Sequence, residues 1–189
     1  MLGEILKGRT DRLMSGLTSR LAGGGVRPGV ARVGEIVSAC ACAACLALGL
    51  KAAGLALLVV HVFFDYLDGA LKRAGAREPF LDAWGAEKAH AVTDKAAEAT
   101  IFAGIGFGDW AQWWSVAVAL VTSLAATLSG VFSLRLAGVR RETSFFDRTD
   151  RMFLLLLSIA ANRVQAGLLA IVVINCVIIA ERIVKALRR

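Results

Sequence analysis

The sequence predicts an all-α, polytopic membrane protein in which six transmembrane helices follow an N-terminal amphipathic juxtamembrane helix. Of its 189 residues, 57% are hydrophobic and 20% are charged, whereas soluble domains contain about 45–50% apolar residues. The mean hydropathy is +0.65. Two prolines, one tyrosine and Ala- and Leu-rich runs without strict alternation favour helices over a transmembrane barrel. We expect one membrane-embedded domain over 1–189, with a surface helix at 1–22 and a bundle at 30–187.

The N-terminal segment has the pattern of a helix that lies on a membrane surface. Its apolar residues recur at helical spacing, and cations share the same stretch. The apolar set is Leu2, Ile5, Leu6, Leu13, Leu17 and Leu21, and the cations are Lys7, Arg9, Arg12 and Arg20. These charges, and the lack of an apolar core segment, also argue against a cleavable signal peptide. Three glycines at 23–25 would form the hinge into the bilayer.

Six later segments are apolar enough to be transmembrane helices. A bilayer helix needs about 20 mostly apolar residues. The predicted spans are 30–50, 53–72, 83–105, 110–137, 152–161 and 164–187, of which the fifth begins at 152 or a little earlier and is short in its purely apolar part.

The distribution of the cations predicts the orientation. If both termini lie on one side, twenty of the 22 Lys and Arg residues lie there, and only Lys51 and Arg163 lie opposite. Because Lys and Arg accumulate on the cytoplasmic side, we expect an integral cell membrane protein with both termini in the cytosol. The net charge of +7 is then explained by the cations on the cytoplasmic side of the membrane, and no nucleic-acid partner is expected.

Several carboxylates fall inside the predicted spans, where an ionisable group is unfavourable by several kcal/mol unless it is paired, hydrated or metal-bound. Asp65 and Asp68 are three residues apart and share a helix face. Asp65 is eleven residues from Gly54, at the outer end of its span, and Asp94 is twelve residues from Gly106. At 1.5 Å per residue both lie about 16–18 Å from that end, so the three carboxylates can meet at one depth.

The span at 83–105 carries a polar stripe. Glu87, His90, Asp94 and Glu98 follow one another at intervals of three, four and four, on one face of the helix. Such a face must be turned toward protein or water. Either the stripe fixes helix register by hydrogen bonds, or the clustered carboxylates bind a hard divalent cation such as Mg²⁺ or Mn²⁺.

Residues 65–73, DYLDGALKR, resemble the first half of the CDP-alcohol phosphotransferase signature, D-x-x-D-G-x-x-A-R. Members of that family are six-span enzymes with a surface helix before the first span, so the resemblance covers nearly the whole chain. It implies that Asp65, Asp68 and Asp94 are metal ligands, and that Asp94 also serves as the catalytic base. It further implies that Asp65, Gly69 and Arg73 face the nucleotide end of the donor.

The chain departs from the signature at several positions. In the second half, His90 stands where the family has its third aspartate and Ala86 replaces a glycine; Lys72 replaces an alanine in the first half, and the spacing after Arg73 is longer than usual. His90 is therefore expected as a metal ligand or as the proton acceptor. Reduced activity, a different metal and loss of catalysis all stay open.

A second resemblance concerns the acceptor. Residues 133–138, SLRLAG, and 145–155, FFDRTDRMFLL, are similar to the acceptor-binding segments of phosphatidylinositol-phosphate and archaetidylinositol-phosphate synthases. It implies that Arg135, Arg148 and Arg151 bind the phosphate of an acceptor such as inositol phosphate, for which the planar guanidinium is well suited. The alternative is that these are ordinary cytoplasmic-side arginines.

The expected function is transfer of a substituted phosphoryl group from a CDP-linked lipid, CDP-archaeol or CDP-diacylglycerol, to a small polar alcohol, with release of CMP in phospholipid biosynthesis. The expected cofactor is Mg²⁺ or Mn²⁺, and the partners are the donor, the acceptor and membrane lipids. A homodimer is left open. The alternatives are a catalytically degenerate homologue that binds lipid or assists assembly, and a cation- or proton-coupled transporter.

Two further polar groups lie near these acids in the sequence. Arg32 and Glu35, three residues apart, are expected to pair. His61 lies one turn from Asp65 and either donates a hydrogen bond to the site or is a buried histidine satisfied elsewhere.

Overall fold

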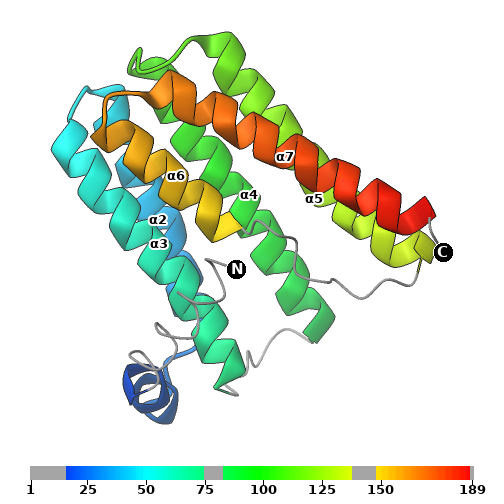
Figure 1. Ribbon diagram of the computed structural model, residues 1–189. Coiled ribbons are helices and arrows are strands. Elements are labelled where there is room, and N and C mark those ends of the chain that lie inside the picture. The colour runs from blue at the N-terminus through cyan, green and yellow to red at the C-terminus, as the bar shows by residue number, and fades with distance from the viewer. Residues whose placement is uncertain (1–15, 75–82, 138–147, 188–189) are drawn as a thin grey trace. The chain divides into compact units, whose positions relative to one another are not determined.

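The computed structural model describes residues 16–74, 83–137 and 148–187, and their side chains over 16–74, 91–129 and 150–185. These residues form a helix at 16–23 and six longer helices, and they contain no β-strand (Figure 1). The six are α2 (Pro28–Ala47), α3 (Lys51–Arg73), α4 (Ala83–Phe107), α5 (Trp113–Ala137), α6 (Arg148–Ala160) and α7 (Val164–Leu187). The all-α prediction is confirmed.

Among the described residues, three helices are long and apolar enough to cross a membrane: Pro28–Ala47, Lys51–Arg73 and Val164–Lys185. A shorter apolar helix covers Trp113–Ser129. These helices indicate an integral membrane protein. The count of six spans and the cytoplasmic orientation stay predictions.

The turn between α2 and α3 explains why α2 ends at 47 and not at the predicted 50. Gly49 has a φ of 74°, a conformation that glycine adopts without steric penalty. The amides of Gly49 and Leu50 donate to the carbonyls of Leu46 and Cys45 at 3.0 and 2.8 Å, and so close the end of α2. Because Lys51 already begins α3, the two helices are antiparallel neighbours.

The chain divides into two compact units, Met1–Gly104 and Ile105–Arg189. The single domain expected over 1–189 therefore stays a prediction.

In the first unit, α2 and α3 pack along their lengths. One buried cluster contains Ala31, Leu67 and Leu71. Leu21, from the helix at 16–23, packs against it, whereas Leu17 is exposed. Residues 1–15, which make up most of the predicted surface helix, lie outside the described part of the chain.

α4 approaches α2 closely at Gly104. A Cβ added there would lie 2.5 Å from both the Cα and the carbonyl oxygen of Ala43. Because both atoms belong to the backbone, the contact can be relieved only by separating the helices. The absence of a side chain at Gly104 therefore allows α4 to pack directly against the backbone of α2 at Ala43.

Gly104→Ala is expected to lower the melting temperature by about 2–12 °C. Overpacking typically costs about 1–3 kcal/mol, and about 2–4 °C is lost per kcal/mol in a chain of this size. Gly23→Ala is the control, because nothing lies within 4 Å of a Cβ at Gly23. Equal melting temperatures for the two variants in detergent would contradict the close approach.

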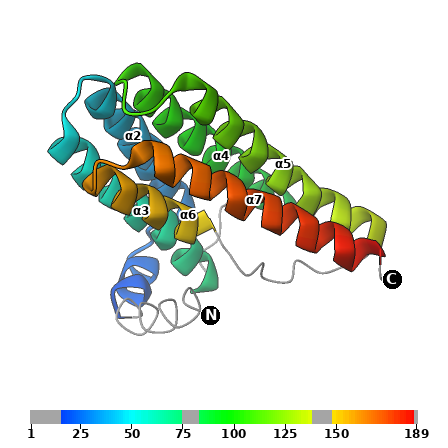
Figure 2. The same cartoon turned by 45° about the horizontal axis from the view of Figure 1, so that its top comes forward.

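In the second unit, α7 packs against both α5 and α6, as both orientations of the ribbon show (Figures 1 and 2). The connection into α5 is held by an edge-to-face contact between Phe107 and Trp113, with ring centroids 5.0 Å apart. The buried apolar side chains of the unit include Leu155, Ile159 and Leu168.

Candidate metal centre

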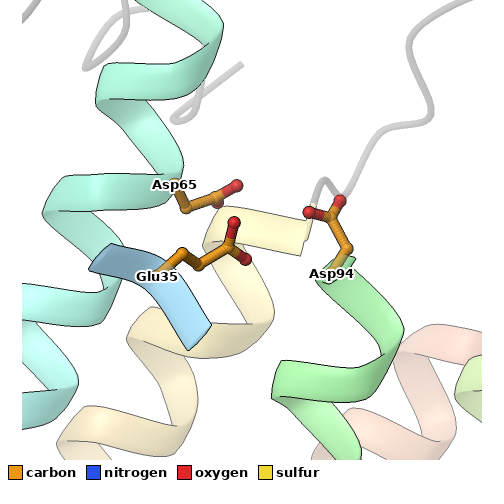
Figure 3. A group of neighbouring side chains, drawn as sticks. All are labelled: Glu35, Asp65 and Asp94. Carbon is orange, nitrogen blue, oxygen red and sulfur yellow. The ribbon is translucent and has the colours of Figure 1, made fainter. Parts of the chain in front are cut away.

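Three carboxylates from three helices of the first unit meet in one place. Glu35 on α2 is fully buried, and Asp65 on α3 and Asp94 on α4 are partly buried. One carboxylate oxygen of each lies within 4.8 Å of one oxygen of the other two. Figure 3 shows the three side chains directed toward one another.

The helical register explains this convergence. Glu35 lies twelve residues before the end of α2, and Asp65 lies fourteen residues after the start of α3. At 1.5 Å per residue these are about 18 and 21 Å from the shared turn. The contact between Gly104 and Ala43 sets the depth of α4, and it leaves Asp94 at a similar level.

These residues fit a hard divalent cation. All three donors are carboxylates, the ligands that Mg²⁺ and Mn²⁺ prefer. Oxygens bound to one ion at about 2.0–2.6 Å cannot be more than about 5.2 Å apart, and the spacing of 4.8 Å or less lies within that limit. Three negative charges at this distance repel one another, and a cation between them would relieve the repulsion.

Asp68, predicted as a ligand, makes two ion pairs. It is fully buried, and its Oδ1 lies 3.4 Å from Nε of Arg32 while its Oδ2 lies 2.5 Å from Nζ of Lys72. Arg32 thus reaches a residue 36 positions away, and its expected pairing with Glu35 stays a prediction. Asp68 as a metal ligand stays a prediction.

Glu35 was not predicted as a member of the carboxylate group. The available signal was that it is the only acidic residue of α2. Pairing with its neighbour Arg32 offered a simpler interpretation within one helix, and only the packing of α2 against α3 and α4 brings Glu35 to the other two carboxylates.

His61 connects the two helices beside this group. The buried imidazole donates from Nδ1 to the backbone carbonyl of Glu35 at 3.2 Å. Because a carbonyl oxygen only accepts, Nδ1 must carry the proton. The bond joins the helix that carries Asp65 to the backbone at Glu35, so His61 helps to fix their separation.

Gly69 and Arg73, which are predicted to face the nucleotide together with Asp65, follow Asp65 on α3 by four and eight residues. A Cβ at Gly69 would meet only Nη1 of Arg73, at 3.4 Å. Arg73 is exposed, and its guanidinium carbon lies 5.8 Å from the centroid of the Tyr66 ring. Their contact with a nucleotide stays a prediction.

The polar stripe of α4 is turned toward protein where its side chains are described. Glu98 is buried and accepts a bond from Nζ of Lys95 at 2.5 Å. The side chains of His90 and Glu87 lie outside the described residues. The roles assigned to His90 and to Asp94 as base therefore stay predictions.

Of the three arginines predicted to bind the acceptor, only Arg151 has a described side chain. It is buried on α6, and its Nη1 donates to Ser123 Oγ on α5 at 3.1 Å and to Asn175 Oδ1 on α7 at 2.7 Å. It therefore ties the three helices of the second unit together. Arg135 lies in α5 and Arg148 begins α6, and the side chains of both are outside the described part.

No protein-family model and no curated protein matches the sequence. Solved structures do match. Mycobacterium tuberculosis phosphatidylinositol phosphate synthase (PgsA1) with CDP-DAG bound superposes with a TM-score of 0.72 and 19% identity, over 93% of this chain and 94% of that chain. The same synthase in complex with manganese and citrate gives 0.70 and 19%, over 89% and 88%. Its apo form gives 0.67 and 18%, over 88% and 92%.

At these identities the match establishes the fold. The chain has the fold of a phosphatidylinositol phosphate synthase, which is a CDP-alcohol phosphotransferase. The predicted resemblance is thus confirmed at the level of the fold.

Proposed function

We propose that this chain is a metal-dependent CDP-alcohol phosphotransferase. It would transfer a substituted phosphoryl group from CDP-diacylglycerol or CDP-archaeol to a small polar alcohol, with inositol phosphate as the first candidate, and release CMP. The observation that carries the proposal is the group formed by Glu35, Asp65 and Asp94. It occurs in a fold shared with a synthase that has been solved with CDP-DAG and with manganese.

Asp65 and Asp94 would hold the divalent cation together with Glu35, and Asp68 and His90 are the further ligands that the family resemblance implies. A cation bound there supplies charge neutralisation at the diphosphate of the donor. Of the three donors in the group, Glu35 is the most deeply buried, so its carboxylate has the least access to water as an alternative partner.

The chain's own residues would position the two substrates. Asp94, or His90 one turn away, accepts the proton of the attacking hydroxyl group. Gly69 lets the nucleotide approach α3, and Arg73 binds its phosphate. Arg135 and Arg148 bind the acceptor phosphate, and Arg151, whose Nη1 also donates to Ser123 and Asn175, is the third arginine that the family resemblance implies. Since phosphoryl transfer depends mainly on positioning and electrostatic stabilisation, these contacts carry most of the catalysis.

Measuring CMP release from purified protein in detergent tests the proposal. CDP-diacylglycerol and CDP-archaeol would each be paired with inositol phosphate, glycerol phosphate and serine, with Mn²⁺ or Mg²⁺ and with EDTA. We expect metal-dependent CMP release with a phosphorylated acceptor.

Two results would favour the alternatives. Metal binding without CMP release from any pair would indicate a non-catalytic homologue. Metal-coupled or proton-coupled uptake into proteoliposomes, again without CMP release, would indicate a transporter.

A further inference from the structure

The buried carboxylate of Asp68 is held by two cations that differ in their access to water. The side chains of Arg32 and Lys72 are 9% and 31% exposed, whereas that of Asp68 is 0% exposed. Arg32 is therefore fixed inside the unit, and Lys72 reaches Asp68 from the solvent side. Lysine has a flexible stem and a compact ammonium, so it can leave such a pair by rotation.

Of the two cations that pair with Asp68, Lys72 is the one that water can reach. Asp65 precedes Asp68 by three residues on α3, and Lys72 follows it by four, so the three side chains lie along one face of the helix. The pair formed by Lys72 and Asp68 thus lies next to the group formed by Glu35, Asp65 and Asp94. A divalent cation bound at that group would compete with the Lys72 ammonium for the Asp68 carboxylate.

We propose that Lys72 is an exchangeable counter-cation of Asp68, which pairs with this carboxylate in the metal-free protein and is displaced when a divalent cation binds. Lys72 thereby weakens metal binding, while Arg32 keeps Asp68 in place. The inference rests on the proposed metal site and adds a residue that sets its affinity.

The test is a Mn²⁺ titration of the full chain in detergent, in which the electron paramagnetic resonance signal of free Mn²⁺ reports binding. Lys72→Met keeps the length of the side chain and removes its charge. We expect the Kd for Mn²⁺ to fall on the order of tenfold. Mn²⁺ should also raise the melting temperature of the variant more than that of the unmodified chain. Lys72→Ala is a second variant, expected to change in the same direction.

Lys185→Met is the matched control. Lys185 also pairs with an acidic residue four positions away on its helix, Glu181, at 2.9 Å. The variant loses the same charge in the second unit, and its Mn²⁺ affinity should stay within about twofold of the unmodified value.

A double-mutant cycle shows whether Lys72 changes the Mn²⁺ affinity through Asp68. If Lys72 acts through Asp68, Lys72→Met should no longer tighten binding in the Asp68→Asn background. Tightening that persists there, or an unmodified chain that binds Mn²⁺ as tightly as Lys72→Met does, would overturn the inference and leave the metal site intact. Absence of binding in both the unmodified chain and Lys72→Met would overturn the metal site and the inference together.

Discussion

Asp65→Asn is expected to abolish metal-dependent CMP release, with a loss of at least about 100-fold. Loss of an outer partner of a metal ligand already costs about 10–100-fold, and Asp65 belongs to the carboxylate group itself. Asparagine keeps the size of the side chain and removes one of the three charges that would attract the cation. The measurement is CMP release at saturating Mn²⁺, together with Mn²⁺ affinity.

Asp109→Asn is the control for this variant. Asp109 is exposed, and its φ is 56°, a conformation that asparagine also adopts readily. Its turnover and melting temperature should match those of the unmodified chain. If Asp65→Asn is folded and retains unmodified turnover, the carboxylate group is not the metal site of the reaction.

Much of the fold follows from local sequence. The apolar runs give the helices, and the predicted end of the last span, 187, is the end of α7. The first span ends early because Gly49 closes α2 with a positive φ, whereas a hydropathy pattern continues through Leu48 and Leu50. Turn conformation depends on hydrogen bonds that hydropathy does not describe.

The candidate site was predicted in part. Counting residues from the outer helix ends places Asp65 and Asp94 at one depth, and the structure brings them together. Glu35 and Arg32 were expected to pair because they are close on one helix, and that pairing stays a prediction. The structure shows that Arg32 also pairs with Asp68 across the α2–α3 contact. Spacing within a helix cannot predict this second partner, because it is set by how the two helices pack.

Arg151→Met is expected to lower the melting temperature by about 5–10 °C. The change removes the donor for Ser123 Oγ and for Asn175 Oδ1, and both of these residues are buried. An unsatisfied buried acceptor costs about 1–3 kcal/mol, and about 2–4 °C is lost per kcal/mol in a chain of this size. Thermal unfolding in detergent, without substrate, measures the effect.

Arg163→Met serves as the control. Arg163 is exposed in the turn before α7, so its loss should change the melting temperature by less than about 2 °C. The KM for a phosphorylated acceptor provides a second measurement on both variants. An unmodified melting temperature with a raised acceptor KM in Arg151→Met would mean that the bonds to Ser123 and Asn175 add little stability and that the guanidinium serves the acceptor. A lowered melting temperature with an unchanged acceptor KM would limit Arg151 to holding α5, α6 and α7 together, and would leave the acceptor phosphate to Arg135 and Arg148.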